Sequence, residues 1–128
     1  MKLLLDTHAF LWWILDDEQL STRVRALIED GSNEILISSA SAWEIAIKCR
    51  IGKLSLPANP SVFVPEQLSI NRFSTLAISV SHALHVHNLP NIHRDPFDRI
   101  LVSQGQLEKM PILTHDSGIN QYDVDTIW

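Results

Sequence analysis

Short apolar runs that alternate with longer segments of helical character are the feature that most limits how this chain can fold. The runs expected to form strands cover residues 2–5, 34–37, 73–78, 111–113 and 126–128. Helices are expected over residues 9–15, 21–30, 61–71, 81–87 and 96–109, with another running from caps within 38–41 to Gly52. Residues 54–60 are expected to form a loop or an edge hairpin. Strands separated by helices predict an α/β fold, with a parallel sheet flanked by helices on both faces.

The length and composition are those of a single globular domain covering residues 1–128, with 45% hydrophobic and 20% charged residues. One cysteine excludes an internal disulfide framework and favours a reducing compartment. The apolar start MKLLLD is interrupted at Asp6, which is too early for a signal peptide or a membrane span, so we expect a cytoplasmic protein with no membrane partner. The net charge of −5 argues against a protein whose main task is to hold nucleic acid, and favours clustered carboxylates, a basic partner, or both.

Four acidic residues are expected at one edge of this sheet, where open α/β folds bind their ligands. Asp6 and Asp116 follow apolar strands, Glu44 lies early in the helix after the second strand, and Asp98 lies in the first turn of the helix that begins at Pro96. Each alone can be explained as a cap, a turn residue or a first-turn acid. Together they would repel one another, and a divalent cation with oxygen ligands would offset that repulsion. Mg²⁺ or Mn²⁺ suits such a site better than zinc.

The segment HRDPFDRIL, residues 93–101, predicts different tasks for its two aspartates. Proline is favoured at the first position of a helix, which makes Asp95 the N-cap and Asp98 the third helical residue. We therefore expect Asp95 to bond to the backbone and Asp98 to point into the acidic site.

Four motifs together carry a family resemblance: LLLDT at the start, SSASAWEIAIK at 38–48, HRDPFDRILVSQ at 93–104 and ILTHD at 112–116. With them the chain resembles the PIN-domain ribonucleases, and among these the VapC toxins of bacterial toxin–antitoxin pairs. The resemblance implies a PIN-like fold with a central parallel sheet of about five strands. It also implies a homodimer and inhibition by a VapB-like antitoxin, which would supply Arg or Lys to the acidic site.

The resemblance further implies a metal-dependent endoribonuclease that hydrolyses RNA phosphodiester bonds. The family's catalytic and metal-binding quartet falls on Asp6, Glu44, Asp98 and Asp116. We expect Asp6 and Asp98 to be the main ligands of Mg²⁺ or Mn²⁺, with Asp116 and Glu44 completing the site directly or through water. One ion or two, and any class of RNA, are compatible with these residues.

Other residues near the quartet have two interpretations each. Asp95, Thr7 and Thr114 are candidates for the outer shell of the site, although capping explains the threonines equally well. Lys48, Arg94 and Arg99 are candidates for contact with the substrate, and ordinary ion pairing is the alternative.

Two other functions are compatible with parts of the pattern. A PIN-like module without catalytic activity could use its acidic rim to bind a basic partner. An aspartyl phosphatase would want a second aspartate two residues after the first, where this chain has His8.

Aromatic and histidine residues outside the quartet give further expectations. Trp43 is expected in the core, as is at least one of Trp12 and Trp13, with the other facing a partner. A group of four histidines is expected to serve as surface or capping residues rather than as a zinc site: His82, His85, His87 and His93.

Overall fold

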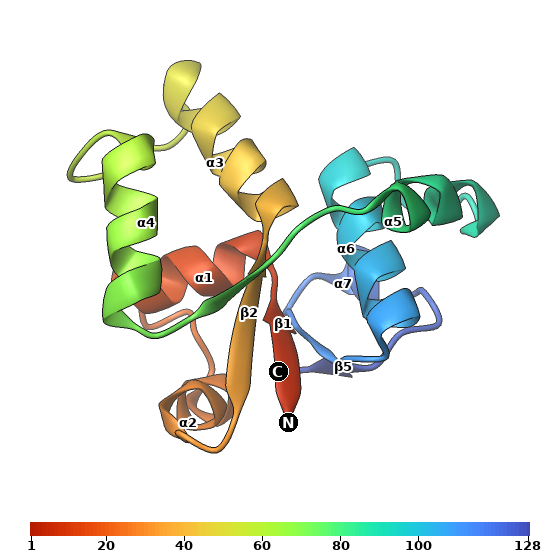
Figure 1. Ribbon diagram of the computed structural model, residues 1–128, viewed down its shortest axis with the longest axis horizontal. Helices are drawn as coiled ribbons and strands as arrows, with labels where there is room; N and C mark the ends of the chain where they lie inside the picture. Colours follow the sequence, from red (N-terminus) through yellow and green to blue (C-terminus); the bar gives the residue numbers. More distant parts are fainter.

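Five parallel strands form one sheet with helices on both faces in the computed structural model, which describes residues 1–128 (Figure 1). The strands lie in the order β3-β2-β1-β4-β5. Their bounds are β1 Lys2–Leu5, β2 Glu34–Ser38, β3 Ser74–Leu76, β4 Ile112–Leu113 and β5 Thr126–Ile127. The predicted α/β fold with about five parallel strands is therefore confirmed.

The helices divide into two groups, one on each side of the sheet (Figure 1). The first group comprises α1 Thr7–Ile14, α2 Thr22–Glu29, α3 Ser39–Arg50 and α4 Pro60–Ile70. The second comprises α5 Val80–His85, the 3-10 turn η1 Val86–Asn88, α6 Pro96–Glu108 and α7 Ser117–Asn120. None of these helices has the length and apolar character needed to cross a membrane.

The central strand β1 is buried on both faces, which explains why its sequence is continuously apolar. Successive side chains of a strand point to opposite faces. Leu3 and Leu5 accordingly pack into the core beneath α1–α4, whereas Leu4 packs into the core beneath α6 and α7. Both cores thus depend on one four-residue strand, and that strand ends directly at Asp6.

The elements differ from the predictions mainly at their ends. Helix α1 begins at Thr7 rather than at residue 9, because the Asp6 side chain caps it. Residues 54–59 form a loop without a strand, Pro60 already begins α4, and β3 is shorter than the predicted 73–78. The short helix α7 was not predicted, because four residues offer too little periodicity to recognise.

Trp12 and Trp13 are half-buried, whereas Trp43 is exposed. Trp13 is half-buried, and its indole N–H donates to Asn71 Oδ1 at 2.9 Å. Trp12 is also half-buried and packs against the same core. The prediction that Trp43 belongs to the core is wrong, because its side chain is 61% exposed. The buried face of α3 includes Glu44 and Ile45, and Trp43 lies beside this face with its ring edge-on to Phe97.

Candidate active site

Strands β1 and β4 pair in parallel, so Asp6, which follows β1, lies next to the residues that follow β4 and lead to Asp116. Leu5 lies opposite Leu113 in the parallel ladder, so Asp6 and Thr114 leave the sheet side by side. The Thr114 hydroxyl donates a hydrogen bond to Asp6 Oδ2, joining two residues 108 positions apart in the chain. Both residues are buried. The expected meeting of strand ends at one edge is therefore present in the fold.

Asp6 is also the N-cap of α1, so both of its oxygens accept hydrogen bonds. Its Oδ1 accepts from the Ala9 backbone N–H at 2.7 Å, while Oδ2 accepts from Thr114. Burial raises the pKa of the Asp6 carboxyl above its ordinary value, and the bond from Thr114 opposes this effect only in part. Capping and a functional role are compatible here, because each carboxylate oxygen has a second lone pair.

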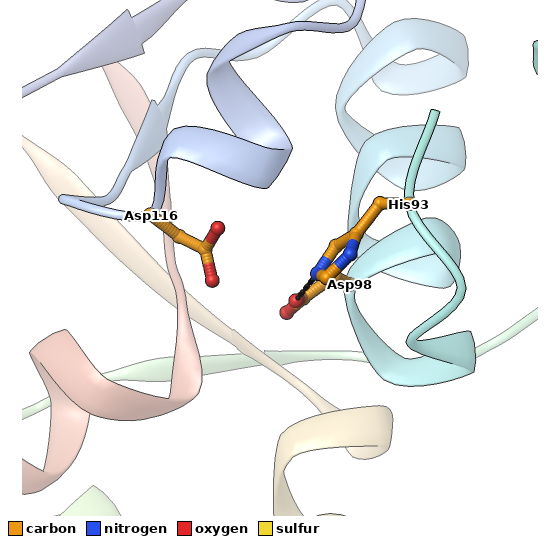
Figure 2. A group of neighbouring side chains, drawn as sticks. All are labelled: His93, Asp98 and Asp116. Atoms are coloured by element: carbon orange, nitrogen blue, oxygen red, sulfur yellow. Dashed lines mark hydrogen bonds and ion pairs between the residues drawn. The ribbon is translucent and has the colours of Figure 1, made fainter. Parts of the chain in front are cut away.

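His93, Asp98 and Asp116 form a close group of side chains that could hold a metal ion (Figure 2). One ligand atom from each residue lies within 4.8 Å of the other two. His93 Nε2 is 2.8 Å from Asp98 Oδ2, and Asp116 faces this pair from the start of α7. Two carboxylates and an imidazole thus converge from segments that are separate in the chain.

Asp95 has the capping role that the HRDPFDRIL segment predicted. Its Oδ1 accepts hydrogen bonds from the backbone N–H groups of Phe97, at 2.9 Å, and Asp98, at 3.4 Å. Pro96 occupies the first helical position of α6. The cap leaves the Asp98 side chain free to turn toward Asp116.

The carboxyl of Asp98 has a strongly perturbed affinity for protons. Burial, together with the neighbouring carboxylates of Asp95 and Asp116, raises the pKa of Asp98 to about 7. The hydrogen bond from His93 opposes this increase. The protein therefore does not supply enough positive charge to balance these carboxylates. A cation bound beside them would stabilise their ionised forms.

Gly118 allows α7 to approach His93 closely. Asp116 caps α7, and its Oδ1 accepts from the Gly118 N–H at 2.6 Å. A Cβ atom at Gly118 would lie 2.7 Å from His93 Cδ2 and 2.9 Å from Asp116 Oδ1. Any other residue at position 118 would therefore displace two of the three converging side chains.

Glu44 lies outside the close group, although it is buried in the middle of α3. Its Oε2 is 2.7 Å from Lys48 Nζ, one helical turn along α3. Thr7 donates to the Ser41 hydroxyl at 2.9 Å and so connects the start of α1 to α3. The local contacts of Glu44, Lys48 and Thr7 are therefore with their own helix or its neighbour.

The two arginines of the HRDPFDR segment differ in their surroundings. Arg94 is exposed. The guanidinium of Arg99 donates to the carbonyls of Pro90, at 2.9 Å, and Val86, at 3.1 Å, and to the Tyr122 hydroxyl at 3.0 Å. These bonds fasten the loop before α6 to the helix, so the geometry favours a structural role for Arg99 over the substrate contact that we considered.

His93 is the member of the site that sequence reasoning missed. The sequence predicts a surface or capping role for it, as for His82, His85 and His87. His82 does take part in a capping box at the start of α5, and His85 contacts Gln106. His93, however, lies two residues before the Asp95 cap, where the chain folds back over the first turn of α6 and reaches Asp98. That offset from a predicted N-cap is the signal that could have identified it.

The sequence matches the PIN domain family over residues 3–125, so the chain belongs to this family. It is 46% identical over 63 residues to Ribonuclease VapC16 of Mycobacterium tuberculosis. That match covers 49% of this chain but only 43% of the relative, which is less than half of its length.

Solved structures share the fold over nearly the whole chain. A chain of VapBC2 from Rickettsia felis, bound to a DNA fragment from its promoter, aligns with a TM-score of 0.74 at 16% identity and covers 100% of this chain and 99% of its own. A chain of DNA-bound VapBC from Salmonella typhimurium gives a TM-score of 0.74, with coverages of 99% and 97%. Both structures are 16% identical to this chain in sequence, so they show a shared fold only.

The raised pKa of Asp98 predicts that this residue destabilises the metal-free protein at neutral and alkaline pH. The folded state favours the protonated form, so the cost is absent below pH 4, grows as pH rises toward about 7, and is complete above it. Asp98→Asn should raise the free energy of unfolding at pH 8 by about 1–2 kcal/mol, after a discount for solvent screening. Urea denaturation in EDTA at pH 8 and pH 5 measures this, with a smaller gain expected at pH 5. Equal gains at both values would contradict it.

The close approach at Gly118 predicts that Gly118→Ala changes the site while the fold persists. The added methyl group pushes on the far ends of two side chains, so we expect little change in melting temperature. Displacing Asp116 and His93 should weaken Mn²⁺ binding about 10-fold or more, as judged by calorimetry. Gly31→Ala is the matched control, because a Cβ there meets no atom within 4 Å. Wild-type Mn²⁺ affinity in Gly118→Ala would show that Asp116 does not hold the ion.

Proposed function

We propose that this chain is a metal-dependent endoribonuclease that hydrolyses RNA phosphodiester bonds. The observation that carries the proposal is the convergence of Asp98, Asp116 and His93 within 4.8 Å at the same edge of the sheet as Asp6. Membership of the PIN domain family and the identity to Ribonuclease VapC16 support it.

The donor groups fit Mg²⁺ or Mn²⁺. Asp98 and Asp116 supply hard carboxylate oxygens, and no cysteine lies among the converging side chains. The raised pKa of Asp98 reflects negative charge that the protein does not neutralise by itself. In this proposal Asp98, Asp116 and Asp6 hold the ion, and Glu44 completes the site through water.

The surrounding residues position these carboxylates. His93 donates from Nε2 to Asp98 Oδ2, which fixes the carboxylate and leaves Oδ1 free for the ion. Thr114 donates to Asp6 Oδ2 and orients that carboxylate, whose Oδ1 accepts from the Ala9 backbone. Lys48, paired with Glu44 and partly exposed, offsets the charge that would repel the RNA backbone. When bound, the ion would lower the pKa of an attacking water and neutralise charge on the scissile phosphate.

We also propose that the enzyme is the toxin of a VapBC-like pair, that it acts in the cytoplasm, and that it forms a homodimer. Chains from VapBC assemblies share its fold over nearly their full length, which supports an antitoxin as partner. The acidic site suggests how such a partner could inhibit. An arginine or lysine of the antitoxin would enter between the carboxylates and compete with the ion.

A catalytically inactive module that binds a basic partner is the second candidate. It is favoured by the net charge of −5 and by the acidic rim. It differs from the nuclease in one measurable respect, because it needs no divalent ion. A calorimetric titration with Mn²⁺ therefore separates the two functions.

RNA cleavage should depend on Asp98 and not on the charge of Asp95. Purified protein is incubated with total cellular RNA in Mg²⁺, in Mn²⁺ and in EDTA, next to Asp98→Asn and Asp95→Asn. We expect discrete products that require the metal and fall at least 100-fold in Asp98→Asn. Asp95→Asn should retain cleavage, since asparagine caps helices as well as aspartate does.

Each result of this comparison has a definite meaning, provided that circular dichroism shows both variants to be folded. Loss of cleavage in both variants would place Asp95 in the outer shell of the site. Cleavage by Asp98→Asn, or by wild-type protein in EDTA, would overturn the proposed mechanism.

Inhibition through the acidic site should be imitated by a basic peptide and weakened by salt. An arginine-rich peptide is expected to inhibit cleavage, and raising the salt from about 50 to about 300 mM should weaken inhibition several-fold through screening. The same peptide with citrulline in place of arginine is the matched control. Equal inhibition by both peptides would rule out a charge-assisted plug.

A further inference from the structure

Four aromatic rings form a continuous row at the edge of the sheet next to the acidic site: His8, Trp12, Trp128 and His115. His8 stacks on Trp12, with ring centroids 5.7 Å apart. Trp12 meets Trp128 edge-on at 5.6 Å, and Trp128 meets His115 at 5.2 Å. We refer to these four residues as the aromatic row.

The sheet topology explains why these rings meet. β1, β4 and β5 are neighbouring parallel strands, with Leu5 opposite Leu113 and Leu113 opposite Ile127. The residues that follow these three strands therefore leave the sheet at one edge. His8 and Trp12 lie one turn apart on α1, His115 follows β4, and Trp128 follows β5.

The aromatic row borders the candidate active site. Asp6 and Asp116 share the lining of one cavity with three members of the row, His8, Trp12 and His115. His8 and His115 are exposed, and their imidazoles contact the rings of Trp12 and Trp128 without a hydrogen bond or an ion pair. Covering the half-buried tryptophans from water explains the stacking, but it does not explain why two unbonded imidazoles open onto a cavity lined by carboxylates.

We propose that the aromatic row binds an unpaired base of single-stranded RNA next to the phosphate that is cleaved, an inference that rests on the proposed function. Every base has a π face that can stack on an aromatic ring, and unpaired bases are the parts of RNA that proteins usually stack in this way. A base on the row lies beside Asp6 and Asp116, which places its phosphate at the carboxylates.

If RNA is the occupant, the charge of the protein favours contact with its bases over contact with its backbone. A chain with net charge −5 and an acidic centre gains little affinity from the RNA backbone, which is itself negative. Stacking supplies affinity that does not depend on charge. The His8 imidazole can also donate a hydrogen bond to phosphate or to the 2′-hydroxyl.

The test measures binding of a fluorescein-labelled oligouridylate by anisotropy, in the cleavage-deficient Asp98→Asn protein. His115→Leu keeps the contact with Trp128 but removes the ring, and it should weaken binding about 5- to 100-fold. His115→Phe restores a ring and should bind within about 2-fold of the parent. His87→Leu is the matched control, since His87 is exposed in η1 on the other side of the sheet.

An abasic oligonucleotide of the same length separates stacking from backbone contact. It should bind weakly and equally to the parent, His115→Leu and His115→Phe. In the active protein, His115→Leu should raise KM for oligouridylate while kcat changes little, because stacking stabilises the bound substrate and the transition state equally.

The outcomes separate this inference from the proposed function. If wild-type protein cleaves RNA but His115→Leu binds oligouridylate like the parent, the enzyme stands and the aromatic row does not bind bases. If wild-type protein cleaves no RNA but oligouridylate binding still requires the ring at position 115, the aromatic row binds bases and the proposed nuclease activity is wrong. Loss of arginine-peptide binding in His115→Leu, with RNA binding unchanged, would assign the row to a protein partner and overturn the inference.

Discussion

The parallel pairing of β1 with β4 is the constraint on which the candidate site depends. It brings together two segments from opposite ends of the chain and places Asp6 and Thr114 in direct hydrogen-bond contact. The same pairing positions Asp116, which follows Thr114 by two residues and caps α7. β5 then extends the edge to Trp128. A two-residue strand, Ile112–Leu113, therefore determines where the acidic centre and its aromatic border lie.

The carboxylates are held in a way that costs the protein stability. Asp6 is buried beneath α1, and Asp98 is crowded by Asp95 and Asp116, so both have raised pKa values. A carboxylate that is buried without a full set of positive partners is normally selected against in a core. Here the surrounding hydrogen bonds, from Thr114 and from His93, orient the groups without neutralising them. This is the expected condition of a site in which a cation completes the structure.

Much of the fold could be predicted because it follows from local patterns. Continuous apolar strands separated by helices are enough to indicate a parallel sheet, and Pro96 is enough to place Asp95 as a cap. What could not be predicted depends on contacts between distant segments. His93 joins the site only because Arg99 and Tyr122 hold its loop against α6, and Trp43 is exposed because other residues of α3 face the sheet. Neither fact is visible in the periodicity of the chain.

The negative charge of the acidic centre explains why affinity for RNA would lie outside it, on the aromatic row. Under the proposed function, a site that binds a divalent cation is negative, and for that reason it would repel the backbone of its RNA substrate. A basic surface would solve this problem, but the chain has a net charge of −5. Placing affinity in aromatic stacking avoids the conflict, because the strength of stacking is largely independent of backbone charge. The aromatic row lies beside the carboxylates and not among them, so the proposed substrate would be held there while the acidic centre stays available to the proposed ion.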